Sequence, residues 1–240
     1  MTLIDLDVLL AAATVDPAVH ELRPDYFALL VAADNLPGGP SDEASDGLLR
    51  EAEAAAIGRL AGAAPEERPH VARWRDAYRA FGAKPQRTRN SLEALLRRVP
   101  EGLPRINRLA DLYNAVSVLH EVPVGGEDLA RYVGPARIVR ATGTEPFETT
   151  ADGQWAVEHP EPGKVVWADD AGVTCRRWNW RQCTRTQFTP ATTRALFIMD
   201  ALGPDAVATA AAAGDDLERR LRDLDPAVET ARRVLTAPRA

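Results

Sequence analysis

The sequence predicts an α+β protein, in which a mixed sheet packs against helices and a helical appendage follows at the C-terminus. Three observations carry this prediction. Apolar side chains recur at the three-to-four-residue spacing of helices through much of residues 48–120. Residues 136–178 contain short β-branched runs bounded by glycine or proline, and residues 204–236 are alanine-rich and amphipathic. Helices before strands, with more helix behind, are typical of the α+β class.

The helices of the first half follow a turn-rich loop at residues 35–47. The first predicted helix covers residues 48–62 and the second covers 70–82. Asn90 and Asn107 are predicted to begin two further helices, because an Asn side chain can accept a hydrogen bond from the free N–H groups of a first helical turn.

Strands are predicted over residues 136–142, 164–170 and 172–178. The last two are expected to form a hairpin that turns at residues 170–172, where Gly172 suits a tight turn. The apolar run at residues 195–202 is too short for its periodicity to separate strand from helix.

The C-terminal tail is predicted to form three helices, at residues 205–213, 215–223 and 226–236. We therefore divide the chain into two parts. Residues 1–202 are expected to form the sheet-containing domain with an N-terminal extension, and residues 203–240 the helical tail.

Composition excludes several classes of protein. The chain has 240 residues, of which 45% are hydrophobic, enough for a sizeable core. The apolar stretch at residues 27–36 is about half of the roughly 18 residues that a membrane span needs. The acidic N-terminus predicts no secretory signal. Two cysteines, Cys175 and Cys183, form neither a disulfide scaffold nor a four-thiolate zinc site. We expect a cytoplasmic protein with no membrane contact, metal or cofactor.

Charge is distributed unevenly along the chain. The formal net charge is −6, which argues against a generic nucleic-acid binder. Counted by segment, however, residues 1–69 carry −9, residues 70–140 carry +6 and residues 141–240 carry −3. The basic middle segment is either a solvated, arginine-rich helix face or a surface that contacts phosphates.

Standard catalytic motifs are missing from the sequence. It has no GxSxG elbow, no GxxxxGK[ST] phosphate loop and no HExxH zinc helix. The four histidines are scattered, without a second ligand at helical spacing. Nothing in the pattern supports a nucleophilic cysteine.

The first segment that could carry function is AYRAFGAKPQRTRNS, residues 77–91. It places Lys84, Arg87 and Arg89 in a loop beyond a helix end. Such cations can follow a phosphate backbone. The alternative is a solubilising loop.

The second segment spans residues 102–129 and places Asp111 and Asn114 within an otherwise apolar helix. This polar pair could cap a neighbouring loop or bind a ligand, and a satisfied buried amide is an equally good interpretation of Asn114. Gly125 and Gly126 permit close backbone approach, in either a tight turn or a pocket wall.

The third segment is CRRWNWRQCTRT, residues 175–186. On a strand, Trp178 and Trp180 would face one way and Arg177, Asn179 and Arg181 the other. The aromatic face could stack a base or ring, or it could simply pack in the core.

Taken in order, these segments resemble the B3/B4 editing domain of the phenylalanyl-tRNA synthetase β-subunit and the free-standing proteins built around it. The similarity lies in LPRINRLADLYNAVSVLHEVPVGGEDL (103–129), IVRATGTEPFETTADG (138–153) and the segment 165–202. The free-standing proteins are also similar in AYRAFGAKP, PVGG and RRWNWR. The resemblance covers about residues 70–202.

The resemblance implies hydrolysis of the ester that joins a wrong amino acid to tRNA, by a positioned water and without metal. It predicts a pocket in which Asn114 and Asn179 are catalytic. The substrate-binding residues that it predicts are Tyr113, Gly125, Gly126 and Trp178. Lys84, Arg87, Arg89 and Arg177 are expected to contact the tRNA.

The sequence departs from the synthetase pattern around this pocket. Gly125 stands where the synthetase has a histidine, and Tyr113 where it has a threonine. Trp178-Asn179-Trp180 replaces a glycine-rich strand end. The predicted function is a trans-acting aminoacyl-tRNA deacylase. The alternative is a non-catalytic module that binds tRNA or an amino acid. A third hypothesis is an unrelated small-molecule hydrolase, for which the sequence offers no nucleophile.

Overall fold

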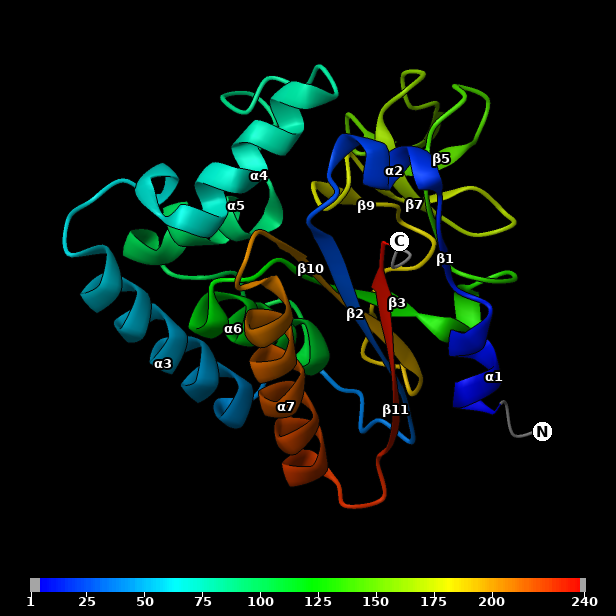
Figure 1. The fold of residues 1–240 in the computed structure, drawn as a ribbon. Coiled ribbons are helices and arrows are strands. Elements are labelled where there is room, and N and C mark those ends of the chain that lie inside the picture. The colour runs from blue at the N-terminus through cyan, green and yellow to red at the C-terminus, as the bar shows by residue number, and fades with distance from the viewer. Residues whose placement is uncertain (1–4, 238–240) are drawn as a thin grey trace.

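A computed structural model describes residues 5–237, and within that range the chain forms an α+β fold with mixed and antiparallel sheets (Figure 1). The helices are α1 (Leu6–Ala11), α2 (Pro17–Leu22), α3 (Glu43–Leu60), α4 (Pro69–Ala80), α5 (Ser91–Arg98), α6 (Arg108–His120) and α7 (Ala206–Leu224). The strands are β1 (Thr14–Val15), β2 (Tyr26–Asp34), β3 (Val124–Asp128), β4 (Arg137–Arg140), β5 (Phe147–Ala151), β6 (Gln154–Glu158), β7 (Val165–Ala168), β8 (Val173–Arg176), β9 (Arg181–Gln182), β10 (Ala195–Leu202) and β11 (Glu229–Thr236).

An antiparallel sheet with the strand order β11-β2-β10-β3 lies at the centre of the fold. Strand β2 is buried on both faces. Leu29 and Val31 pack with α6 and α7, whereas Leu30 points to the opposite side. Successive side chains of a strand alternate between faces, so a strand that is covered on both sides needs an almost continuous apolar sequence. YFALLVAA meets this requirement.

A mixed sheet with the order β1-β4-β7-β8-β9 lies on the other side, where β1 and β4 are parallel and the remaining pairs antiparallel. The apolar core between the two sheets also receives α4. It contains Trp74, Tyr78, Trp167 and Trp178 together with Ile198 of β10. The fold-class prediction is confirmed, and this layered arrangement leaves β3 at the edge of the central sheet.

Several local predictions are also confirmed. Asn90 accepts a hydrogen bond from the Glu93 N–H at 2.9 Å, and Asn107 accepts one from the Ala110 N–H at 2.9 Å, so both residues are helix N-caps. Strands β7 and β8 form the expected hairpin. The ambiguous run at residues 195–202 is strand β10.

The prediction of a purely helical C-terminal appendage is wrong. Residues 206–224 form one continuous helix, and residues 229–236 form β11, which pairs antiparallel with β2. Gly214 does not break α7. A Cβ there would lie 2.5 Å from Leu29 Cδ2, so glycine allows the helix to approach the sheet closely.

The sequence ETARRVLT becomes a strand because β2 has a second edge whose N–H and C=O groups need partners. Local propensity does not reveal that need, since it arises only when β2 is in place. Ion pairs then hold the strand to α7. Arg232 Nη1 lies 2.7 Å from Asp215 Oδ1, and its Nε lies 2.5 Å from Glu218 Oε1.

Candidate functional site

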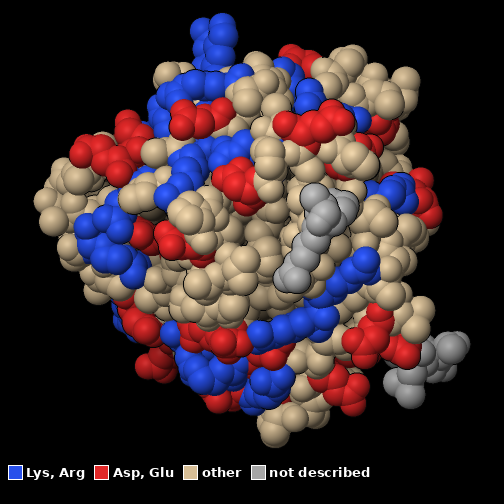
Figure 2. Space-filling model, in the orientation of Figure 1, with Lys and Arg blue, Asp and Glu red and all other residues tan. Residues whose placement is uncertain are grey.

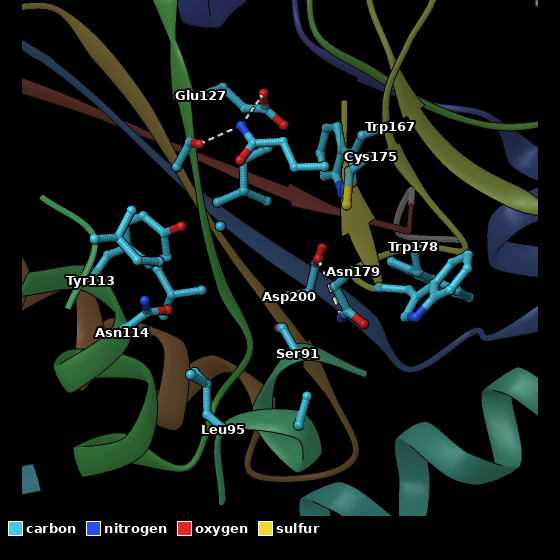
Figure 3. Close-up of a pocket in the computed structure, with 18 of the residues that line it drawn as sticks. Ser91, Leu95, Tyr113, Asn114, Glu127, Trp167, Cys175, Trp178, Asn179 and Asp200 are labelled. Atoms are coloured by element: carbon cyan, nitrogen blue, oxygen red, sulfur yellow. Dashed lines mark hydrogen bonds between the residues drawn. The ribbon is translucent and has the colours of Figure 1, made fainter. Parts of the chain in front are cut away.

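A cavity of about 270 Å³ opens beside β3. Strands β3 and β10 form one wall, β7, β8 and the turn at residues 177–180 form another, and α5 and α6 complete it (Figure 3). Pockets for drug-sized ligands span about 300–1,000 Å³. This cavity therefore suits a group of amino-acid size, with the remainder of a larger ligand lying outside.

The structure brings together all six residues that were predicted for the pocket. The cavity is lined by Tyr113, Asn114, Gly125, Gly126, Trp178 and Asn179. It is not lined by Lys84, Arg87, Arg89 or Arg177. Of the predicted RNA contacts, Arg177 adjoins the cavity through Trp180, and none of the four lines it.

Of the two glycines of β3, only Gly126 is required by its surroundings. A Cβ on Gly126 would lie 2.5 Å from Phe188 Cε2 and 2.9 Å from Tyr113 Cε1, so no side chain fits there. A Cβ on Gly125 would meet no atom within 4 Å. Gly125 thus leaves open space on the cavity side, at the position where the resemblance placed a histidine.

The outer edge of β3 also offers a backbone donor. The Gly126 carbonyl accepts a hydrogen bond from Gln182 Nε2 at 2.6 Å, and the Asp128 N–H donates to Thr186 O at 2.8 Å. Both groups point away from β10. Because the N–H and C=O of one residue share a side of the strand, the Gly126 N–H points outward as well. It can donate to a ligand in the cavity.

Helix α6 supplies Tyr113 and Asn114 to the cavity wall (Figure 3). Asn114 is 6% exposed, yet its side-chain amide has no hydrogen-bond partner within residues 5–237. Because Asn114 lines the cavity, this amide is free to form hydrogen bonds with water or with a ligand there. Its neighbour Asp111 has a structural role instead. It accepts hydrogen bonds from Ser45 Oγ at 2.9 Å and from the Ile106 N–H at 2.8 Å.

The segment 177–180 is a turn, and the predicted alternation of its side chains on a strand is wrong. Arg177 and Trp178 have φ values of 50° and 70°, in the left-handed region, and these values change the direction of the backbone here. As a result Trp178, Asn179 and Trp180 all line the cavity. The Arg177 guanidinium lies 4.7 Å from the Trp180 ring centroid and hydrogen-bonds to Thr88, so it braces the turn.

Asp200 of β10 is a buried carboxyl in the cavity wall that the sequence did not reveal. The Tyr26 hydroxyl donates to its Oδ1 at 2.6 Å, and Asn179 Nδ2 lies 3.5 Å from its Oδ2. The Tyr78 hydroxyl donates to Asn179 Oδ1 at 2.9 Å. Burial raises the pKa of Asp200 to about 7. Asn179 is thus a partner of Asp200, and both of its polar atoms are engaged.

Glu127 of β3 is a second buried carboxyl in the wall. Its Oε2 accepts hydrogen bonds from Gln182 Nε2 at 2.7 Å and from the Thr186 hydroxyl. Burial raises the pKa of Glu127 to about 8. Within the described residues, neither Glu127 nor Asp200 forms an ion pair with an Arg or Lys side chain.

The raised pKa of Glu127 predicts how the stability of the protein changes with pH. The native pKa of about 8 exceeds the ordinary value of 4.5, so the native state binds more protons between these values and loses stability as pH rises. Glu127→Gln removes this loss. Relative to wild type, the variant should gain on the order of 3–5 kcal/mol in unfolding free energy between pH 4 and pH 9.

Urea unfolding at both pH values measures this effect. The same comparison with Glu101→Gln, an exposed carboxyl, is the control. An equal difference between wild type and Glu127→Gln at both pH values would contradict the prediction.

The cavity offers neither an activated nucleophile nor a cluster of metal ligands. Cys175 lines the wall, but burial raises the pKa of its thiol well above the ordinary value, which disfavours the thiolate. Within residues 5–237, no three His, Cys, Asp or Glu side chains converge to hold a metal ion. The described side chains of the wall can form hydrogen bonds and transfer protons.

Basic side chains gather over α4 and α5, in the upper part of Figure 2, with acidic ones between them. Lys84, Arg87 and Arg89 are exposed in the loop that joins these helices. Arg89 lies 3.7 Å from the buried Glu93, whereas Lys84 and Arg87 form no ion pair within the described residues. No helix within the described range is long and apolar enough to cross a membrane.

The chain thus forms an α+β domain with a small cavity at the edge of its central sheet. Residues 73–236 match the B3/4 domain family, and the chain belongs to that family. The match confirms the resemblance and extends past residue 202 through β11.

One solved structure that is similar to the chain is an N-terminal fragment of the phenylalanyl-tRNA synthetase β-subunit from Pyrococcus horikoshii. Sequence identity is 11% and the TM-score is 0.42. The alignment covers 93% of this chain and 50% of the fragment, so the chain spans about half its length. No curated protein matches the sequence.

Proposed function

We propose that this protein is a trans-acting aminoacyl-tRNA deacylase, which hydrolyses the ester of a mischarged tRNA. One observation carries the proposal: within a B3/4 domain, an unpartnered Asn114 amide shares an amino-acid-sized cavity with the buried carboxyl of Asp200. A hydrogen-bond donor and a base at one site are what ester hydrolysis by water requires.

In the proposed reaction, the Asp200 carboxylate accepts a proton from a water molecule while the water oxygen attacks the ester carbonyl carbon. Asn114 Nδ2 and the Gly126 N–H donate hydrogen bonds to the oxyanion that forms. The C–O bond to the terminal ribose then breaks, and the proton on Asp200 passes to the departing ribose oxygen. The products are a free amino acid and uncharged tRNA.

The remaining polar groups position the reactants. Asn179 and the Tyr26 hydroxyl hold the Asp200 carboxylate. Glu127 serves as counter-ion to the α-ammonium group of the aminoacyl ester, because a nearby cation lowers the pKa of a buried carboxyl and favours its ionised form. Trp178 and Tyr113 supply apolar wall.

The second candidate is a non-catalytic module that binds tRNA or an amino acid. The open space beside Gly125 favours it, since any contribution from a side chain at that position is missing. A panel of mischarged tRNAs separates the two functions. Deacylation of at least one tRNA faster than in buffer supports the enzyme, whereas tight tRNA binding without any turnover supports the module.

Lys84, Arg87 and Arg89 are proposed to contact the tRNA backbone. The triple charge reversal K84E/R87E/R89E should reduce the slope of log affinity against log salt concentration by about 2–3, because each lost phosphate contact removes about 0.7–0.9. Binding titrations of tRNA across a salt series measure the slope. Arg131→Glu, a reversal at an exposed residue elsewhere, is the control. An unchanged slope in the triple variant would show that the loop is not part of the interface.

A further inference from the structure

Helix α5 presents one stripe of side chains to the cavity. Ser91, Ala94, Leu95 and Arg98 line it, at positions i, i+3, i+4 and i+7 of the helix. Leu92, Leu96 and Val99 lie on the adjoining stripe and pack in the core. The helix thus forms a continuous wall that runs from the cavity to the protein surface.

Arg98 stands at the outer end of this wall and is exposed. Other arginines nearby are engaged. Arg97 Nε lies 3.0 Å from Glu93 Oε1, and Arg105 Nη1 lies 2.6 Å from Glu53 Oε1. Arg98 forms no ion pair within the described residues, although it lines the cavity. Its guanidinium is therefore available to an anion at the cavity mouth.

Ser91 stands at the inner end of the wall. Its hydroxyl oxygen is buried and has no hydrogen-bond partner within the described residues. The Ser91 N–H donates to Asn179 O at 3.0 Å, which ties this end of α5 to the turn beside Asp200. On the far rim, Ile106 is 56% exposed and offers apolar surface to a flat ring.

We propose that α5 binds the 3′-terminal nucleotide of the tRNA, with Arg98 on its 5′ phosphate and Ser91 on a ribose hydroxyl. This inference rests on the proposed function and adds a nucleotide subsite to it. A guanidinium forms paired, charge-assisted hydrogen bonds with a phosphate, and a hydroxyl suits a ribose. The order of these groups along α5 places the acyl group inside the cavity and the polynucleotide outside.

The test uses a non-hydrolysable probe, 3′-(L-alanylamino)-3′-deoxyadenosine, with and without a 5′ phosphate. Dissociation constants are measured by calorimetry for wild type, Arg98→Ala and Arg131→Ala. Arg131 is a matched control, because it is exposed, has no ion pair within the described residues and does not line the cavity. Wild type and Arg131→Ala should bind the phosphorylated probe about 10-fold or more tightly than the unphosphorylated one.

Arg98→Ala should bind both probes equally, with the affinity that wild type has for the unphosphorylated one. The subsite is overturned if the preference for phosphate persists in Arg98→Ala, if wild type shows no preference, or if wild type binds neither probe. Hydrolysis of mischarged tRNA by wild type tests the proposed function separately. Binding of the probes without hydrolysis would therefore refute the deacylase and keep the nucleotide subsite.

Discussion

Replacing Asp200 with Asn is expected to lower kcat for deacylation by about 10²–10⁴-fold, the usual contribution of a general base. Asp200 is the carboxyl in the cavity whose pKa, about 7, is best matched to proton transfer near neutral pH. Asn at this position keeps the shape of the side chain and an oxygen for the Tyr26 hydroxyl. The variant should therefore lose activity but remain folded.

The pH dependence of kcat gives this prediction a second readout. A general base acts only when it is ionised, so wild-type kcat should rise with pH and level off above about 7. In the Asp200→Asn variant, kcat should lack this rise with pH. Tyr26→Phe should move it to higher pH, because the Tyr26 hydroxyl stabilises the ionised carboxylate.

Single-turnover rates between pH 5 and 9 measure these profiles, and thermal unfolding of each variant checks the fold. An Asp200→Asn variant that kept wild-type kcat, or that kept the rise of kcat with pH, would remove Asp200 from the reaction. A general loss of rate without a shift in Tyr26→Phe would indicate a purely structural hydroxyl.

Features that depend on local chemistry could be predicted from the sequence. The caps at Asn90 and Asn107 need only a side chain that reaches its own helix, and the β7–β8 hairpin needs only two β-branched runs with a turn between them. Strand β11 could not be predicted in this way. It depends on a partner about 200 positions earlier, the free edge of β2.

Some residues of the candidate site could likewise be predicted from the sequence, and others could not. Asn114 and the two glycines of β3 stood out from their neighbours in the sequence, and the resemblance then assigned them to a pocket. Of the three, only Gly126 has contacts that explain its residue type. Asp200 and Glu127 were missed, since each looks like an ordinary acidic residue at a strand or loop end. A signal was present for Asp200. It is the one charged residue in the apolar run ALFIMDAL, and a carboxyl in a buried strand needs a partner or a ligand.

Replacing Asn114 with Ala is expected to lower kcat/KM for deacylation by about 10²–10³-fold, the usual effect of losing one oxyanion donor. Stability should change little. The Asn114 amide has no hydrogen-bond partner within the described residues, so its removal breaks no internal bond. Loss of activity with an unchanged midpoint of unfolding is therefore the expected combination.

Asn114→Asp separates hydrogen-bond donation from space filling, because it keeps the shape of the side chain but replaces the donor with an acceptor. If Asn114 donates to the oxyanion, Asp should be at least as damaging as Ala, since a negative charge there opposes the charge that develops. If Asn114 only fills space, Asp should retain most of the activity. Gln154→Ala removes an exposed amide outside the cavity and should leave the rate unchanged. Equal activity in the Asp variant and wild type would exclude Asn114 as a donor, and the oxyanion would then depend on the Gly126 N–H at the edge of β3.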